Sequence, residues 1–192
     1  MVVVTKSSIG LLTAAEYGAL DGTTFGDTEL VEGRLSLSPE PEWQHKLAAH
    51  ELLVQLRPQL PEHLTLLANT YVDLELNPAD APGFVRRPDL VVTRDTETSR
   101  AGRSDGLLPA AEVLIVIEVV SPSSVRTDYV TKRGEYADAD IPHYWIVDIE
   151  QPISLLACDQ AADLGYVDTG EYRTHFTTDT PINTHLNLDT LL

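Results

Sequence analysis

The hydrophobic pattern of the chain is strongest at Val113–Val120, where seven of eight consecutive positions are apolar. A short run rich in β-branched residues and bounded by turn residues is typical of a strand that is buried on both faces of a sheet. Glu118 is the one charged residue in this run. A buried carboxylate is costly unless a cation, a metal or a hydrogen-bond donor accompanies it. Glu118 is therefore the first candidate for a functional residue.

Apolar positions elsewhere predict three helices, at 13–20, 41–56 and 126–139. Thr13 and Glu16 have the spacing of a capping box at the start of the first helix. Residues 29–38 predict two short strands around a tight turn at Glu32-Gly33. The remaining apolar or alternating runs predict strands at 64–67, 71–76, 88–93, 143–149, 153–158, around Tyr166 and at 172–177.

Turn-rich and polar stretches at 21–27, 77–86 and 94–111 separate these elements, and neither a repeat nor a linker interrupts them. The order of elements predicts one α/β (α+β) domain over 1–192, with a mixed central sheet flanked by the helices at 41–56 and 126–139. We expect strands 88–93 and 113–120 to be neighbours and almost inaccessible to solvent.

Charge and composition limit the partners and the cellular location that we expect for the protein. The 192 residues carry 13 Lys and Arg against 30 Asp and Glu, a net charge of −17. Such a charge opposes loose electrostatic attraction to nucleic acid or acidic lipid. The lone Cys158 excludes an internal disulfide framework, and neither a signal peptide nor a membrane span is predicted. We therefore expect a cytoplasmic protein that does not associate with membranes.

A pair of carboxylates is the strongest chemical signal in the sequence. Asp89 follows Pro88 at the start of one buried strand, and Glu118 stands near the end of another. Carboxylates on adjacent strands can converge on one point, and hard oxygen ligands suit Mg²⁺ or Mn²⁺. If they share one cation, the two carboxylates lie within about 8 Å of each other. Val120, which shares a face with Glu118, stands where a catalytic lysine would be expected.

These residues resemble the motif of the PD-(D/E)XK nuclease superfamily, and more narrowly the Uma-type restriction endonuclease family. Asp89 and the segment Glu118–Ser123 carry the main motif, and the resemblance covers most of the chain. Further matching blocks occur in the same order along the sequence: Leu12–Tyr17, Glu29–Gly33, Ser38-Pro39 with His45, and Ile141–Asp148.

The resemblance implies a restriction endonuclease-like core that cleaves nucleic acid with a divalent metal. Asp89, Glu118 and the backbone carbonyl of Val119 would hold Mg²⁺ or Mn²⁺. Lys132, in the following helix, would replace the lysine missing at position 120. We expect its ammonium within about 5 Å of a Glu118 oxygen.

Two more residues enter the candidate site through the same resemblance. Glu29 would be a further acidic ligand or would orient water, with Glu32 a weaker choice for that role. His45 could hydrogen-bond a phosphate or a carboxylate.

Each of these residues also has a purely structural interpretation. Asp89 could cap a strand, Glu118 could pair with Arg87, and His45 could make a structural hydrogen bond. Lys132 follows Asp128 by four residues, so the two could form an exposed ion pair on the helix surface.

Two functions remain open at this point: a metal-dependent endonuclease, acting most simply on DNA, and an inactive nuclease-fold module for binding or assembly. The net charge favours the module. Eight cations expected to flank the site favour the enzyme: Arg86, Arg87, Arg94, Arg100, Arg103, Arg126, Lys132 and Arg133. Cleavage of both strands of a duplex would be simplest for a homodimer.

Overall fold

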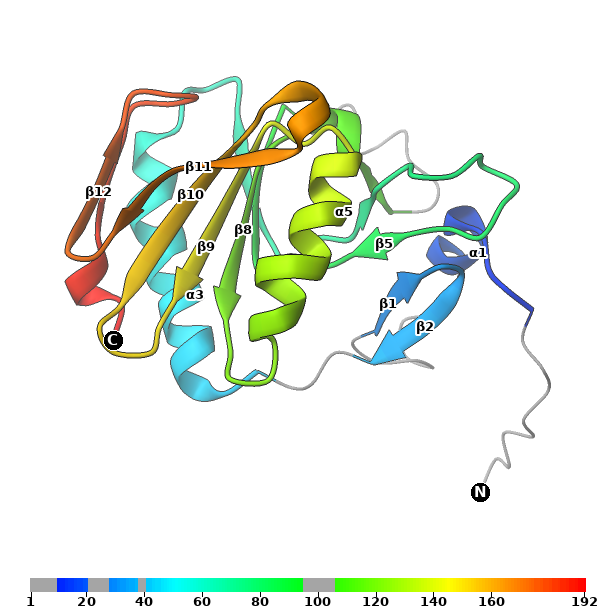
Figure 1. The fold of residues 1–192 in the computed structure, drawn as a ribbon, viewed down its shortest axis with the longest axis horizontal. Coiled ribbons are helices and arrows are strands. Elements are labelled where there is room, and N and C mark those ends of the chain that lie inside the picture. Colours follow the sequence, from blue (N-terminus) through cyan, green and yellow to red (C-terminus); the bar gives the residue numbers. More distant parts are fainter. Residues whose placement is uncertain (1–9, 21–27, 38–40, 95–105) are drawn as a thin grey trace.

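The computed structural model describes residues 10–20, 28–37, 41–94 and 106–192. Its main feature is a six-stranded mixed sheet in the order β11-β10-β9-β8-β6-β3 (Figure 1). The strands are β3 (Thr65–Ala68), β6 (Leu90–Thr93), β8 (Val113–Val120), β9 (His143–Asp148), β10 (Ser154–Gln160) and β11 (Tyr166–Tyr172). β8 runs parallel to β9 and antiparallel to β6, so the sheet is mixed as predicted.

β8 is an inner strand whose eight residues are all buried. Its side chains alternate between two apolar clusters, because successive residues of a strand face opposite sides of the sheet. Ile115, Ile117 and Val119 belong to one cluster, and Val116 and Val120 to the other. β6 lies beside β8 and is buried along its whole length. The predicted pairing and burial of these two strands are confirmed.

Helix α3 (Trp43–Leu56) covers one face of the sheet (Figure 1). It packs Ala48, Leu52 and Leu56 against the cluster that contains Ile115 and Ile117. The hairpin β12 (His175–Thr178) and β13 (Thr184–Asn187) extends the same layer. The 3₁₀ turn η1 (Arg57–Gln59) follows α3, with Pro58 at its start.

The opposite face is covered by a helix that is not regular throughout (Figure 1). Its first part, η3 (Thr127–Lys132), is π-helical, and its second part, α5 (Arg133–Asp138), is α-helical. Tyr144 of β9 donates its hydroxyl to the Asp128 carbonyl of η3 at 3.0 Å. This hydrogen bond joins the irregular turn to the sheet. π-helical turns are rare and occur often at functional sites.

A second, five-stranded sheet lies beside the main one, in the order β2-β1-β5-β4-β7. Its strands are β1 (Thr28–Val31), β2 (Arg34–Leu37), β4 (Val72–Asp73), β5 (Val85–Arg86) and β7 (Leu108–Pro109). The predicted turn between β1 and β2 is confirmed, with φ of 50° at Glu32 and 73° at Gly33. Helix α1 (Ala14–Gly18) packs here, and its capping box between Thr13 and Glu16 is present. Three short 3₁₀ turns complete the fold: η2 (Ala110–Glu112), η4 (Ala162–Leu164) and η5 (Leu188–Thr190).

Two predictions about elements were wrong. The region 77–86, predicted as a connector, ends in β5, and the predicted strand 71–76 is reduced to the two residues of β4. The predicted mixed central sheet is present, and the second sheet and the β12–β13 hairpin accompany it. The predicted helix at 126–139 is present, and its π-helical turn was not predicted. The expected loop 21–27, most of 94–111 and the Ser38-Pro39 turn fall outside the described residues.

Candidate active site

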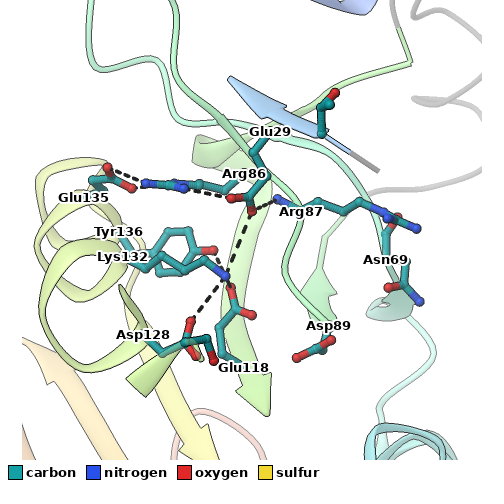
Figure 2. A network of polar contacts seen from close by, with 12 residues as sticks. Glu29, Asn69, Arg86, Arg87, Asp89, Glu118, Asp128, Lys132, Glu135 and Tyr136 are labelled. Carbon is teal, nitrogen blue, oxygen red and sulfur yellow. Dashed lines mark hydrogen bonds and ion pairs between the residues drawn. The ribbon is translucent and has the colours of Figure 1, made fainter. Parts of the chain in front are cut away.

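Asp89 and Glu118 lie at the same end of the main sheet. Leu90 pairs with Ile117 in the antiparallel register of β6 and β8, Asp89 directly precedes Leu90, and Glu118 directly follows Ile117. The Val119 N–H donates to Asp89 Oδ2 at 2.8 Å, which holds the Asp89 side chain against the end of β8. Figure 2 shows both carboxylates in the candidate site, and both line the same cavity. Their shared binding of one cation stays a prediction.

Glu118 is 3% exposed and receives two hydrogen bonds on one oxygen. Lys132 Nζ donates to Glu118 Oε1 at 2.8 Å, and the Tyr136 hydroxyl donates to the same oxygen at 2.7 Å (Figure 2). The predicted approach of Lys132 to Glu118 is confirmed, and the alternative pairing of Glu118 with Arg87 is wrong. Both donors bind Oε1, which leaves Oε2 as the oxygen able to accept a further ligand.

The pKa values of this pair reflect an excess of negative charge. Burial raises the pKa of Glu118 above its ordinary value, against the opposing effect of Lys132, and the charges of Asp89 and Asp128 raise it further. Burial lowers the pKa of Lys132, but the surrounding carboxylates outweigh burial and raise it. Lys132 therefore remains an ammonium whether or not Glu118 is protonated, because Asp128 and Glu29 also lie close to its Nζ.

Lys132 is 9% exposed and lies at the end of the π-helical turn. Besides Glu118, its Nζ lies 3.3 Å from Asp128 Oδ1 and 3.9 Å from Glu29 Oε1. The Asp128 pair predicted as one alternative exists, but it is buried rather than on a solvated helix face. Three carboxylates from two strands and one helix therefore fix the position of this ammonium (Figure 2).

Glu29 is positioned by the second sheet through a buried arginine. Arg86 Nη1 donates to Glu29 Oε2 at 2.8 Å, and the backbone N–H of Arg87 donates to Glu29 Oε1 at 3.0 Å. Burial raises the pKa of Glu29, but Lys132 and Arg86 outweigh burial and lower it. The other edge of Arg86 binds both carboxylate oxygens of Glu135 in α5, at 2.6 and 2.7 Å. Arg86 thus connects the second sheet to the helix that carries Lys132.

His45, on the first turn of α3, binds the other member of the carboxylate pair. Its Nε2 lies 3.1 Å from Asp89 Oδ2, which also accepts the Val119 N–H at 2.8 Å. Burial lowers the pKa of His45, but hydrogen bonding and charge from Asp89 and a bond to the Val119 backbone outweigh it and raise the pKa. His45 therefore makes the carboxylate contact that was predicted as one of its two options.

These side chains line a cavity of about 440 Å³. Its acidic lining residues are Glu29, Glu42, Asp89, Glu118 and Asp128, and its Lys and Arg residues are Arg86, Arg87 and Lys132. Five acidic against three basic groups leave a formal charge of −2 with His45 neutral. Within the described residues, no group of three or more His, Cys, Asp or Glu side chains is arranged as a metal site. Two carboxylates and a backbone carbonyl do fit a hard divalent cation, which would also balance the charge.

The expectation that eight cations flank the site was too broad. Arg86, Arg87 and Lys132 line the cavity, whereas Arg133 pairs with Asp168 at 2.6 Å. Arg94 and Arg126 are exposed and do not line it, and Arg100 and Arg103 lie outside the described residues.

Sequence reasoning placed Arg86 among the cations that flank the site without predicting its ion pairs, and it assigned no role to Glu135 or Tyr136. Tyr136 follows Lys132 by four residues, so helical spacing already placed the two on one face. Glu135 carries no such signal, and Arg86 stands in a segment predicted as a turn-rich connector. Their contacts join residues 49 and 57 positions apart, which only the folded chain brings together.

The mixed sheet flanked by helices, with paired carboxylates at the end of its central strands, defines a protein of the nuclease fold class. A putative nuclease of the DUF820 family from Anabaena variabilis ATCC 29413 has a similar crystal structure, with a TM-score of 0.63 and 14% sequence identity. The match covers 94% of this chain and 97% of that chain. The model of the Uma2 family, described as "Putative restriction endonuclease", matches residues 14–176. The chain therefore belongs to the Uma2 family.

A search of curated proteins finds no match to this chain. Within the described residues, the structure contains no helix with both the length and the apolar character needed to cross a membrane.

Proposed function

We propose that this protein is a divalent-metal-dependent endonuclease that hydrolyses phosphodiester bonds of DNA. One observation carries the proposal: Asp89 and Glu118 line one cavity, and the Lys132 ammonium contacts Glu118 at 2.8 Å. Carboxylates beside an ammonium are the groups that phosphodiester hydrolysis with a metal requires. Membership of the Uma2 family supports nuclease activity independently of this geometry.

Mg²⁺ or Mn²⁺ would be held by Asp89, Glu118 and the Val119 carbonyl. When bound, the ion would lower the pKa of a water molecule and offset charge on the scissile phosphate. The donor set supports this assignment, because all three groups present the oxygen atoms that these hard cations prefer. The charge of the cavity supports it too, since one divalent cation neutralises the formal −2 of its lining.

The protein's own groups prepare this chemistry in three ways. Lys132 remains protonated and offers positive charge to the developing transition state or to the attacking water. Tyr136 and Lys132 together occupy Oε1 of Glu118, which leaves Oε2 for the metal ion. Glu29 and Asp128 hold the ammonium in place, while His45 and the Val119 N–H hold Asp89.

Plasmid cleavage tests the proposed reaction. Wild-type protein with Mg²⁺ or Mn²⁺ should nick or linearise supercoiled DNA, and chelation with EDTA should stop the reaction. Asp89→Asn, Glu118→Gln and Lys132→Met should each reduce the rate by at least about 10²-fold, the scale typical of lost transition-state stabilisation. RNA of the same sequence should be cut more slowly. A Lys132→Met protein that cleaves at the wild-type rate would contradict the assignment.

An inactive module is the second candidate, and the acidic lining of the cavity favours it. A module would bind nucleic acid or a protein without cleaving, and the three substitutions would leave its binding unchanged.

Sedimentation of the wild-type protein alone and with duplex DNA tests the further expectation of a homodimer, the simplest arrangement for cutting both strands. We also expect the protein in the cytoplasm, where its lone Cys158 would stay reduced.

A further inference from the structure

The side chain of Asn69 lines the candidate active site without a protein partner. Asn69 directly follows β3, is exposed, and belongs to the lining of the 440 Å³ cavity. Among the residues that the structure describes, its carboxamide makes no hydrogen bond, whereas its backbone makes two. A carboxamide has two N–H donors and one carbonyl acceptor. Asn69 therefore offers this hydrogen-bonding capacity to a molecule that enters the cavity.

The backbone of Asn69 is held on both sides of its side chain. Ala68 pairs with Leu90 in the register of β3 and β6, and the Asn69 N–H donates to the Asp89 carbonyl at 3.0 Å. The Asn69 carbonyl accepts a hydrogen bond from Arg87 Nε at 3.4 Å. Figure 2 shows Asn69 together with Arg87 and Asp89. The position of the carboxamide is therefore tied to Asp89, a proposed metal ligand.

Asn69 has a left-handed backbone conformation, with φ of 51°. Glycine adopts this conformation at no steric cost, and asparagine adopts it more often than most other residues. Glycine would therefore satisfy the backbone at this position, but it would leave the cavity without the carboxamide. A substitution by glycine separates the role of the side chain from the role of the backbone.

Two cationic donors of the same cavity are already engaged by carboxylates. Nε, Nη1 and Nη2 of Arg86 each bind Glu29 or Glu135, and Lys132 Nζ lies within 4 Å of three carboxylates. A neutral carboxamide is not drawn into an ion pair of this kind. Its N–H groups therefore stay available for an anionic oxygen, even though acidic residues outnumber basic ones in the cavity lining.

We propose that the Asn69 carboxamide donates a hydrogen bond to a backbone phosphate oxygen of the DNA strand that is bound beside Asp89. This inference rests on the proposed nuclease function and adds a substrate-binding residue to it. Amide side chains are among the groups that contact phosphate oxygens in complexes of proteins with DNA, and such contacts fix the register of the strand without reading its bases. Asn69 thereby holds the strand in a fixed position relative to the Asp89 carboxylate.

DNA binding by Asn69 variants tests the contact. Affinity for a fluorescein-labelled duplex is measured by anisotropy with Mg²⁺ in a Glu118→Gln background, where cleavage is blocked. Asn69→Gly should weaken binding about tenfold at every sequence tested, the scale of a lost hydrogen bond to a charged group. Asn69→Asp also tolerates the left-handed backbone, but it should weaken binding at least as much, because a carboxylate repels phosphate. Equal affinities for Asn69→Gly and the background protein would overturn the contact, even if the wild-type protein cleaves DNA.

Glu75→Gly is the matched control for the backbone. Glu75 also has a left-handed conformation, with φ of 53°, and it is exposed but does not line the cavity. Glu75→Gly should bind DNA as tightly as the background protein, and circular dichroism establishes that each variant folds. A loss for Glu75→Gly equal to that for Asn69→Gly would overturn the contact, because it would assign the effect to the backbone.

Nuclear magnetic resonance identifies the group that Asn69 contacts. The side-chain N–H₂ signals of Asn69 are assigned by their absence from Asn69→Gly and are followed in the Glu118→Gln protein with Mg²⁺. A dithymidine phosphodiester should shift these signals, and its uncharged methylphosphonate analogue should shift them much less. Equal shifts with both compounds would assign the contact to a base or sugar and overturn the phosphate contact. Signals that move with neither compound would overturn it too.

Metal binding is measured separately, because a carboxamide oxygen can also ligate a divalent cation. Asn69→Gly should show the same change in Tm with Mn²⁺ as the wild-type protein, and a smaller change would make Asn69 a metal ligand and overturn the proposal. Weaker DNA binding by Asn69→Gly in a protein whose wild type never cleaves would support the contact and refute the nuclease. No binding of DNA by the background protein would overturn the contact.

Discussion

Glu118 is the residue on which the candidate site most depends, and Tyr136 is the less obvious of its two partners. A buried carboxylate that loses one of its donors retains its desolvation penalty without full compensation. We expect Tyr136→Phe to lower the free energy of unfolding by about 1–3 kcal/mol. It should also reduce cleavage, because Glu118 Oε1 then keeps Lys132 as its single donor among the contacts described.

Tyr166→Phe separates the effect on stability from the effect on cleavage. Tyr166 donates its hydroxyl to the Ile141 carbonyl at 2.7 Å and belongs to the same apolar cluster as Tyr136. Its loss should destabilise the protein by a similar amount without changing the cleavage rate of the folded protein. Urea unfolding and initial-rate measurements on both variants provide the comparison. Equal cleavage rates for the two variants would show that Tyr136 has only a structural role.

Glu29 makes the stability of the protein depend on pH in a predictable direction. Lys132 and Arg86 lower its pKa below the ordinary value despite burial. An acidic group with a lowered folded-state pKa stabilises the fold above its unfolded-state pKa of about 4.5. That contribution is lost as the pH falls through the folded-state value. Wild-type protein should therefore lose stability below about pH 5, and Glu29→Gln should lose less over the same interval.

Thermal unfolding between pH 6 and pH 3 measures this difference. Glu62→Gln, which alters an exposed carboxylate on a loop, is the control and should follow the wild-type curve. Parallel curves for Glu29→Gln and wild type would mean that Glu29 is not held in its ionised form.

Among the elements, the π-helical turn η3 decides where Lys132 points. A π turn contains one more residue than the corresponding stretch of α-helix, so it shifts every later side chain around the helix axis by about 100°. Val130 lies within the turn and is 63% exposed. Deleting Val130 should allow a regular α-helix and move Lys132 relative to Asp128 and Tyr144. We expect cleavage to be lost while the protein remains folded.

Val130→Ala is the control for the deletion, because it removes exposed side-chain atoms but keeps the residue count. It should retain wild-type cleavage. Circular dichroism establishes that both variants fold, and the plasmid assay measures activity. A fully active deletion variant would show that the π turn does not position Lys132.

A comparison of predicted and observed elements shows which parts of the fold and of the site could be predicted from the sequence. The continuous apolar run of β8 predicted a strand buried on both faces, and its single charge directed attention to Glu118. Periodicity placed Lys132 and Tyr136 on one helix face, although it gave no sign of a π turn. β5 escaped prediction because Val85 and Arg86 stand between Pro82-Gly83 and Pro88, which read as turn residues. Arg86 could not be identified as buried, since its burial depends on Glu29 and Glu135, and neither is near it in the sequence.

For the molecule as a whole, the net charge of −17 creates a difficulty for any nuclease. The acidic body repels DNA, and it also attracts divalent cations without specificity. A specific metal site must therefore be distinguished from general screening of surface charge. The site of Asp89 and Glu118 differs from the surface in being partly or fully buried and in having an excess of negative charge within one cavity.

The increase in stability of the whole protein when a metal ion is added distinguishes a specific metal site from general screening of surface charge. A ligand that binds only the folded state stabilises it by about 2.7 kcal/mol at a concentration of 100 Kd. For a chain of this length, that gain corresponds to a rise of roughly 5–10 °C in Tm. We expect Mn²⁺ to raise the Tm of the wild-type protein by this amount at constant ionic strength, with a saturating dependence on concentration. Asp89→Asn removes a ligand but leaves nearly all of the surface charge, so its Tm should respond to Mn²⁺ no more than to an equivalent ionic strength of NaCl. If Asp89→Asn gained as much stability from Mn²⁺ as the wild type, the ion would be acting on the acidic surface, and the inactive module would become the better account of the fold.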